Sequence, residues 1–331
     1  MPGVEARVKE FGASFEKMRG ELAKVIVGQN EIVENVLVAM LAGGHVLLEG
    51  LPGLGKTKLI KTIADTFELA FSRIQCTPDL MPADILGTTI LSEDAHGKRG
   101  FEFQRGPIFG NVVLTDEINR ATPKTQSALL QAMQEGAVSI GNTTYPLAQP
   151  FFVLATQNPI ELEGTYPLPE AQLDRFMLKL LSPPPDLNSL VTILERTTAG
   201  SGAVVSKVLS GVELMAIRTL VHNVPAATAV LQYAARIVMA THPEQAHAPQ
   251  SVRSYVKYGS SPRGAQAIVL CAKVQALLKG RYHVAIEDVK SMVRPALRHR
   301  LILNFEGEAA GVKADTILDD ILKSVKESAV E

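Results

Sequence analysis

The sequence predicts an α/β domain with a phosphate-binding loop, followed by a second domain that is all helical. The first observation is the stretch at residues 50–57, GLPGLGKT, which fits the phosphate-loop pattern G-x-x-x-x-G-K-[ST] at every fixed position. The second is an apolar run at 111–115 that ends in two acids, Asp116 and Glu117. The third is a run of three prolines, 183–185, beyond which the residue pattern is helical.

The phosphate loop lies between an expected buried strand, 45–49, and an expected helix, 58–70. Glycines let consecutive backbone N–H groups point inward, and the helix N-terminus adds a field that favours a phosphate chain. Lys56 would contact the β- and γ-phosphates, and the Thr57 hydroxyl would ligate Mg²⁺. A glycine-rich turn without a ligand is the alternative. The expected nucleotide contacts are Gly50, Pro52, Gly53, Leu54, Gly55, Lys56, Thr57 and Lys58.

The segment before the first strand is expected to complete the pocket. Six apolar residues spaced by four and three fall on one helical face: Val4, Val8, Phe11, Phe15, Met18 and Leu22. Residues 1–24 are therefore predicted to form an amphipathic helix that packs on the core domain, 25–182, in preference to a coiled-coil partner. Because this upstream segment often lines the base pocket of phosphate-loop proteins, Ile26, Val27 and Gly28 are candidate adenine contacts.

Polar side chains follow two of the predicted parallel strands, where ligands of open α/β sheets bind. Asp116 is placed to hold the water shell of Mg²⁺, and Glu117 to act as general base on the attacking water. The alternative is that these acids only cap the next helix. Asn158 follows the strand at 151–156 and is a candidate hydrogen-bond partner of that water or of the γ-phosphate, although turns also favour asparagine.

Two hairpins are expected within the core domain. Extended patterns near 88–104 surround a polar tip with Lys98 and Arg99, for which a solvated loop is an equally good interpretation. A strand, a Gly-Asn turn and a second strand are predicted over 138–145.

The second domain is predicted to span 186–331. Arg263 lies in the first turn of a helix, where its charge opposes the helix dipole unless a phosphate is near. Arg294, Arg298 and Arg300 have the spacing of one helix side and are expected to be solvated.

The whole-chain composition is that of an ordinary globular protein. The 331 residues suit about two domains, and Lys+Arg 33 against Asp+Glu 34 gives no excess of positive charge to attract nucleic acid. The two cysteines have no ligand spacing and are expected to be reduced thiols. No signal peptide or membrane-spanning run is visible, so we expect no membrane insertion and a cytoplasmic location.

Four stretches resemble the MoxR family of AAA+ ATPases, in the clade with a helix-2 insert, and the similarity covers nearly the whole chain. They are 73–84, 116–121, 155–159 and 170–176, with the sequences RIQCTPDLMPAD, DEINRA, ATQNP and EAQLDRF. Cys76 is the main departure, at a position where an aromatic residue is expected. The resemblance implies an AAA+ core with a five-stranded parallel sheet, an all-α lid domain and a ring, expected to be a hexamer, with nucleotide between subunits.

The resemblance also assigns residues to roles. It makes Asn158 the first sensor and Arg263 the second sensor from the lid. It makes Arg175 an arginine finger presented to the γ-phosphate of a neighbour, whereas the residues alone suggest only a surface ion pair with Asp174. The two hairpins match the helix-2 insert and the pre-sensor hairpin, which would face the ring centre or a client protein.

The leading hypothesis is a Mg-ATP hydrolase whose ring remodels, activates or matures a partner protein. The resemblance implies clients with a von Willebrand factor A domain. One alternative is a nucleotide-gated scaffold whose hydrolysis is incidental. Another is a DNA-associated AAA+ motor, which the near-neutral charge disfavours. A small-molecule kinase or GTPase is disfavoured because the guanine motif Asn-Lys-x-Asp is absent.

Overall fold

The computed structural model describes residues 3–93, 99–159, 164–198 and 203–327. Its centre is a five-stranded parallel sheet in the order β2-β5-β8-β1-β9. The strands, in chain order, are β1 Val46–Gly50, β2 Phe71–Gln75, β5 Val112–Asp116, β8 Phe152–Gln157 and β9 Leu178–Ser182. The predicted α/β core with a five-stranded parallel sheet is confirmed.

Each central strand buries both of its faces, because successive side chains point to opposite sides of the sheet. Val46, Leu114 and Leu154 join a cluster on the side of α1, α2 and α3. Leu47 and Val153 join a second cluster on the side of α4 and α5. The bounds of these helices are α1 Val4–Ala23, α2 Asn30–Ala42, α3 Lys56–Thr66, α4 Pro82–Leu86 and α5 Pro123–Glu135. Layers on both faces explain why the strands are apolar throughout.

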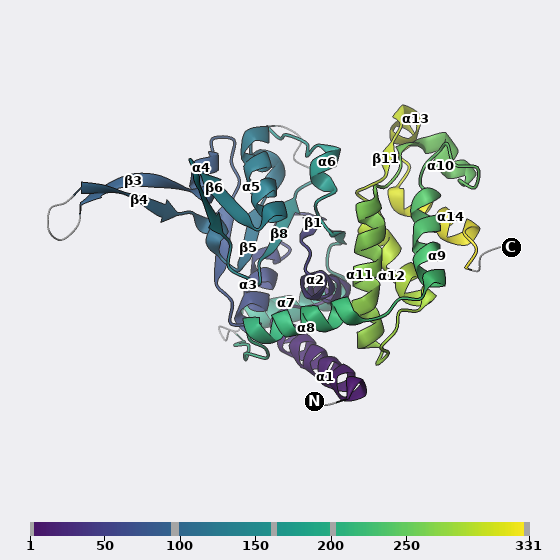
Figure 1. The fold of residues 1–331 in the computed structure, drawn as a ribbon, viewed down its shortest axis with the longest axis horizontal. Helices are drawn as coiled ribbons and strands as arrows, with labels where there is room; N and C mark the ends of the chain where they lie inside the picture. The colour runs from purple at the N-terminus through teal and green to yellow at the C-terminus, as the bar shows by residue number, and fades with distance from the viewer. Residues whose placement is uncertain (1–2, 94–98, 160–163, 199–202, 328–331) are drawn as a thin grey trace.

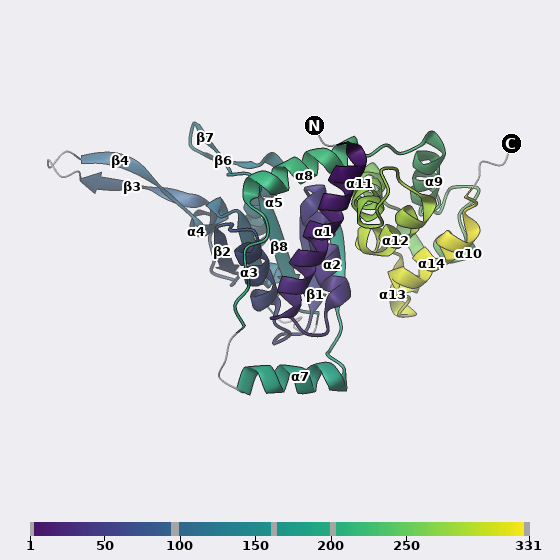
Figure 2. The ribbon, with the colours of Figure 1, turned by 90° about the horizontal axis from the view of Figure 1, so that it is seen from below.

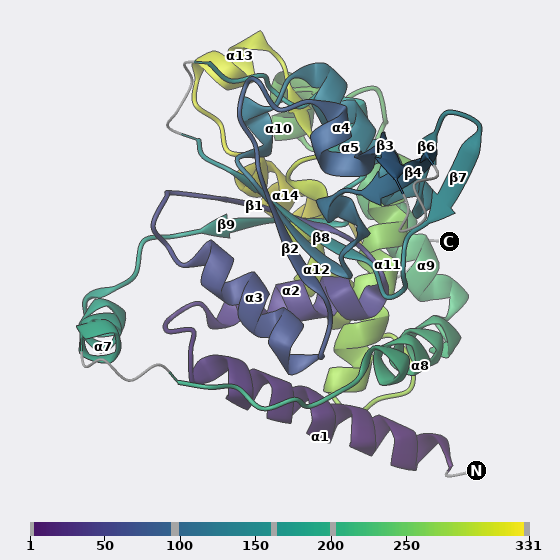
Figure 3. The ribbon, with the colours of Figure 1, turned by 90° about the vertical axis from the view of Figure 1, so that its left-hand side faces the viewer.

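The N-terminal helix α1 lies under the core and reaches the second domain (Figures 2 and 3). It contacts α2 and α3 of the core and also α11, Pro262–Leu278. Five of the six residues predicted for its apolar face are buried: Val8, Phe11, Phe15, Met18 and Leu22. Val4 lies near the helix start and is exposed. The helix thus packs against both parts of the chain.

Both hairpins form as antiparallel pairs. β3 Gly87–Glu93 pairs with β4 Arg99–Arg105, and this hairpin projects from the body (Figure 1). Lys98 lies outside the described residues. β6 Ala137–Ile140 pairs with β7 Thr143–Pro146. Phe103 on β4 stacks on Tyr145 on β7 with ring centroids 4.3 Å apart, so the hairpins support each other where they leave the core. Short 3₁₀ helices, η1 Pro107–Phe109 and η2 Ile118–Arg120, flank β5.

Beyond β9 the regular structure of the described residues is helical, with one exception. The helices there are α7 Leu187–Thr198, α8 Gly211–Asn223, α9 Thr228–Met239, α10 Gln250–Tyr255, α11, α12 Ile286–Leu297, α13 Phe305–Ala309 and α14 Ala314–Ser324, and the short helix α6 Glu170–Leu173 precedes β9. The exception is an antiparallel pair that the sequence did not predict, β10 Val256–Tyr258 with β11 Ile302–Leu303. Strands of two and three residues are too short to give a period-two pattern. Among the described residues, no single helix is long and apolar enough to cross a bilayer, and α8 with α9 passes only as a pair bent by 94°.

The expectation that Arg294, Arg298 and Arg300 are all solvated is wrong. Only the Arg294 side chain is mostly exposed, and it pairs with Asp319. The Arg300 side chain is 3% exposed and lies against the core domain. α12 ends at Leu297, so Arg298 and Arg300 lie in the turn directly after it, where the spacing of a helix face does not apply.

We expect Phe15→Ala to lower the free energy of unfolding by about 3–5 kcal/mol, because it removes a buried ring between α1 and its neighbours. Urea denaturation measures the change. The exposed residue Glu10 on the same helix provides the control, and Glu10→Ala should stay within about 0.5 kcal/mol of the wild type. Equal unfolding free energies for the two variants would show that α1 is not part of the core.

Candidate nucleotide site

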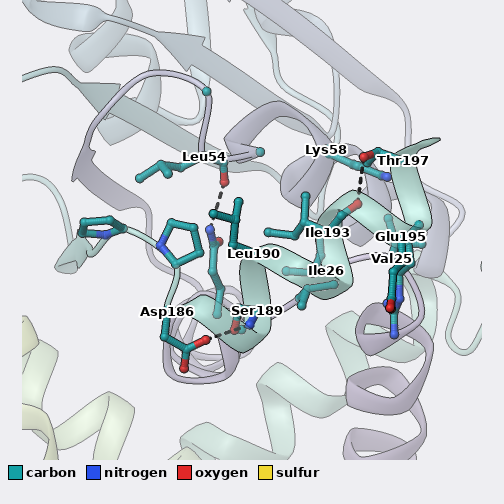
Figure 4. Close-up of a pocket in the computed structure, with 18 of the residues that line it drawn as sticks. Val25, Ile26, Leu54, Lys58, Asp186, Ser189, Leu190, Ile193, Glu195 and Thr197 are labelled. Carbon is teal, nitrogen blue, oxygen red and sulfur yellow. Dashed lines mark hydrogen bonds between the residues drawn. The ribbon is translucent and has the colours of Figure 1, made fainter.

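A cavity of about 1000 Å³ opens beside the phosphate loop. Three segments meet there: the loop, the segment before α2, and the proline linker with α7 (Figure 4). Among the predicted site residues, those that line this cavity are Ile26, Val27, Gly28, Gly53, Leu54, Gly55 and Lys58. The structure therefore brings the proposed base contacts and the phosphate loop to one cavity.

The far wall of this cavity is α7, which sequence reasoning did not assign to the site. Leu190 and Ile193 on α7 line the cavity together with Ile26, and these three side chains form an apolar slot (Figure 4). Such a slot suits the flat face of a nucleobase. Gln29 closes the slot on the loop side, because its Nε2 donates to the Leu54 carbonyl at 2.9 Å.

The absence of a side chain at Gly28 allows α7 to lie close to the segment before α2. The Gly28 φ of +73° is a conformation that side chains disfavour, and a Cβ there would lie 2.3 Å from the Ser189 hydroxyl oxygen. α7 itself buries none of its residues and is held by few bonds. Asp186 caps its start by accepting from the Ser189 N–H at 2.8 Å, and Arg196 donates to the carbonyls of Ala23 and Lys24.

The phosphate loop has the backbone that its glycines predict. Gly53 and Gly55 have φ of +80° and +74°, and Lys56 and Thr57 begin α3. The Lys56 ammonium donates to the Gly50 carbonyl at 2.5 Å. Burial lowers the pKa of Lys56, and the nearby carboxylates of Asp116 and Glu117 oppose that shift. The parallel pairing of β1 with β8 and of β8 with β5 places these acids at the sheet edge from which the phosphate loop leaves.

Thr156 on β8 connects the two acids at the end of β5. Its hydroxyl donates to Asp116 Oδ1 at 3.0 Å and accepts from the Glu117 N–H at 2.9 Å. Glu117 has a φ of +55°, which is uncommon for a residue with a side chain. The bond from the Glu117 N–H to Thr156 therefore stabilises the turn in which Glu117 lies. Sequence reasoning missed Thr156, because a buried threonine in a strand carries no signal of its own.

Side chains from β2 and η2 hold the two carboxylates. Arg73 donates to Asp116 Oδ2 at 2.9 Å through Nε. Glu117 Oε2 accepts from Gln75 at 3.2 Å and from Arg120 at 3.1 Å. Because β2 pairs with β5 so that Gln75 lies opposite Asp116, alternate residues of β2 face these acids. Arg73, Gln75 and Arg120 are site residues that the sequence did not reveal.

The donor set fits Mg²⁺. Magnesium prefers hard oxygen ligands and uses one or two protein groups with waters and phosphate oxygens. Thr57 lies in the first turn of α3 directly after the loop, and Asp116 ends β5 at the same edge of the sheet, so they offer a hydroxyl and a carboxylate there. The described part of the chain holds no cluster of three or more His, Cys, Asp or Glu that could bind a metal, so a cage made only of protein groups is not formed there.

Asn158 lies at the same edge of the sheet. Glu49 on β1 pairs with Gln157 on β8, so the phosphate loop and Asn158 leave neighbouring parallel strands together. Asn158 is 6% exposed.

Arg175 and Arg263 lie elsewhere. Both line a separate cavity of about 270 Å³ between the core and α11. Arg175 precedes β9, whose strand runs parallel to β1, so it lies at the N-terminal edge of the sheet and the phosphate loop at the C-terminal edge. Five strand residues separate these edges by about 16 Å. The structure thus does not bring Arg263, predicted as a nucleotide contact, to the phosphate loop of its own chain.

The expected ion pair between Arg175 and Asp174 does not form. Asp174 instead pairs with Arg300 at 2.8 Å, and Arg263 Nη1 lies 3.7 Å from it. The Arg175 Nε atom is buried and has no hydrogen-bond partner among the described residues. Asp174 and Arg175, although adjacent in the chain, therefore do not share a partner.

Thr156→Val should lower the free energy of unfolding by about 1–3 kcal/mol, because the shape is kept while a buried N–H and a carboxylate lose their partner. Chemical denaturation measures the loss, and Thr156→Ser, which keeps the hydroxyl, is the matched control. A valine variant as stable as the wild type would contradict the bridge between the acids.

Comparison with known proteins agrees with this geometry. Residues 45–178 match the model of the "ATPase family associated with various cellular activities (AAA)", and residues 248–321 match the "AAA lid domain". The chain is 41% identical to "Chaperone MoxR1" of Mycobacterium tuberculosis over 94% of its own length and 82% of that protein. It is 30% identical to "Protein MoxR" of Methylorubrum extorquens, over 97% and 95% of the two lengths.

The fold comparison gives the same result. The crystal structure of a Cytophaga hutchinsonii protein assigned as an ATPase matches with a TM-score of 0.91 and 41% identity, covering 97% of both chains. The phosphate loop, the paired acids after β5 and these full-length similarities together show that the chain belongs to the MoxR family of AAA+ ATPases.

Proposed function

We propose that this protein is a magnesium-dependent ATP hydrolase that works as a ring and remodels, activates or matures a partner protein. The observation that carries the proposal is the meeting of the phosphate loop, an apolar slot and the strand-end acids at one edge of the sheet. The sequence similarity to a chaperone-named MoxR protein supports the choice of a protein client.

The cavity supports ATP as the bound nucleotide. Its apolar slot between Ile26 and the α7 residues Leu190 and Ile193 would take the base, and the loop N–H groups would take the phosphates. On binding, the Lys56 ammonium would exchange the Gly50 carbonyl for phosphate oxygens.

Thr57 and Asp116 are the residues that would hold Mg²⁺. When bound, the metal neutralises charge on the β- and γ-phosphates. Glu117 would accept the proton of the attacking water, while Asn158 would orient that water or the γ-phosphate. Gln75 and Arg120 hold the Glu117 carboxylate and so set its direction.

The positions of Arg175 and Arg263 support the proposal that several subunits assemble. Both face a cavity at the sheet edge opposite their own phosphate loop, so a triphosphate that they touch would belong to a neighbouring subunit. Arg175 would be the arginine finger and Arg263 a second sensor that acts between subunits. A hexamer and a cytoplasmic location stay predictions.

The projecting β3–β4 hairpin is the candidate client contact. It presents Phe101, 82% exposed, and Leu91, which pairs with it across the two strands. An exposed apolar pair on an extended hairpin suits contact with another protein. A von Willebrand factor A domain is the client class that the family resemblance suggests.

Glu117→Gln should retain ATP binding and lose turnover by about 10²- to 10⁴-fold, because the amide cannot accept the proton. Calorimetry measures the binding, and phosphate release measures the turnover. Glu287→Gln on the exposed side of α12 serves as control and should leave both unchanged. Turnover that survives in the Glu117 variant would remove this residue from the role of base.

Arg175→Ala should lower turnover by about 10³-fold at protein concentrations that allow assembly. Mixing this variant with Glu117→Gln should restore part of the activity, because each subunit supplies what the other lacks. Wild-type activity of Arg175→Ala, or a mixture no more active than its components, would show that the finger does not act between subunits.

A further inference from the structure

The lid is hydrogen-bonded to the core domain by three consecutive residues that directly follow α12. Arg298 Nη1 donates to the Lys179 carbonyl at 3.3 Å, and the His299 ring nitrogen Nε2 lies 3.0 Å from the Phe176 carbonyl oxygen. Arg300 makes more bonds than either. All three therefore bind the stretch of core backbone that leads from Arg175 into β9.

Arg300 binds on both sides of Arg175. Its Nη2 donates to the Asp174 carbonyl at 3.0 Å and to the Phe176 carbonyl at 2.8 Å, and its Nε donates to the Asp174 carboxylate at 2.8 Å. Its Nη1 adds the Met177 carbonyl at 3.2 Å. The carbonyls of Asp174 and Phe176, the residues on either side of Arg175, are thus held by one buried guanidinium.

Asp174 collects the other lid contacts. Its carboxylate accepts from the Ser261 hydroxyl at 2.9 and 2.8 Å, and Ser261 is the N-cap of α11, which carries Arg263. Arg263 approaches the same carboxylate at 3.7 Å. A single acid next to Arg175 in the chain therefore contacts Arg263, the N-cap of its helix, and Arg300.

The charges around this cavity favour a bound anion. Its described lining has three arginines, Arg175, Arg263 and Arg300, and one acid, Asp174. His45 also lines it, but burial lowers the pKa of that ring to about 4, so it is neutral near pH 7. The excess of two positive charges is compensated by no other lining residue, and Arg175 has a buried Nε without a partner.

We propose that Arg300 is a positioning residue for Arg175, and that the Asp174–Arg300 pair couples the position of the lid to the direction of the arginine finger. This inference rests on the proposed function, because it assumes that Arg175 touches a neighbour's triphosphate. Arg300 itself is enclosed by core carbonyls and does not reach that phosphate. A rotation of the lid about the core would therefore pull on the Asp174 and Phe176 carbonyls on either side of Arg175.

Arg300→Lys tests the proposal, since lysine keeps the charge but cannot bind Asp174, Phe176 and Met177 together. We expect turnover at assembly concentrations to fall about 10- to 100-fold, as for a finger displaced by about 1 Å. The dissociation constant for ATP should not change, because the nucleotide cavity of the same chain lies at the other edge of the sheet. Asp174→Asn should act in the same direction and keeps the size of the side chain.

The deciding measurement is a double-mutant cycle. In the Arg175→Ala background, Arg300→Lys should cause no further loss, because there is no finger left to position. If Arg300→Lys lowered turnover by the same factor in both backgrounds, the proposal would be overturned, and Arg300 would contribute to stability alone. Arg281→Lys is the matched control, because Arg281 binds the fully buried Asp288 within the lid at 2.7 Å, and its effect should be equal in the two backgrounds.

Failure of the proposed function gives a different result. If Arg175→Ala alone leaves turnover unchanged, Arg175 does not act as an arginine finger. If Arg175→Ala lowers turnover and Arg300→Lys does not, with assembly and melting temperature unchanged, only the coupling through Arg300 is overturned.

Discussion

Parallel pairing of β1, β8 and β5 is the constraint on which the site depends. Parallel strands end at the same edge, so the phosphate loop, Asn158 and the acids Asp116 and Glu117 meet although they are far apart in the chain. The apolar side chains that fill both faces of these strands hold the pairing. Loss of register in β8 would displace Thr156 and with it the bond that stabilises the turn at Glu117.

The same parallel arrangement separates two groups of charged residues. Those at the C-terminal edge surround the phosphate loop of the same chain, whereas Arg175 and Arg263 lie at the N-terminal edge about one strand length away. The proposed function therefore requires assembly, because one chain does not bring these two arginines to its own phosphate loop. Arg300 connects the second group to the lid.

The wall of the cavity that would hold the base is much less closely packed than the sheet. α7 closes that cavity but buries none of its own residues, and its position depends on a cap, two bonds from Arg196 and a close approach to Gly28. Segments with few buried contacts open at low free-energy cost. In the proposed binding mode, a weakly held wall over the base and a firmly packed sheet under the phosphates would give the two ends of the nucleotide different freedom.

The sequence by itself determined the local features: the glycine loop, the acids after an apolar strand, the hairpins and the helical second half. Each depends on neighbouring residues, whose spacing is visible in the chain. Only the tertiary structure decided which distant residues meet. It placed Thr156 between the acids, Gln75 and Arg73 opposite them, α7 over the base slot and Arg300 beside Arg175. It also separated Arg263 from its own phosphate loop, because strand order and lid docking follow from long-range packing that residue spacing does not encode.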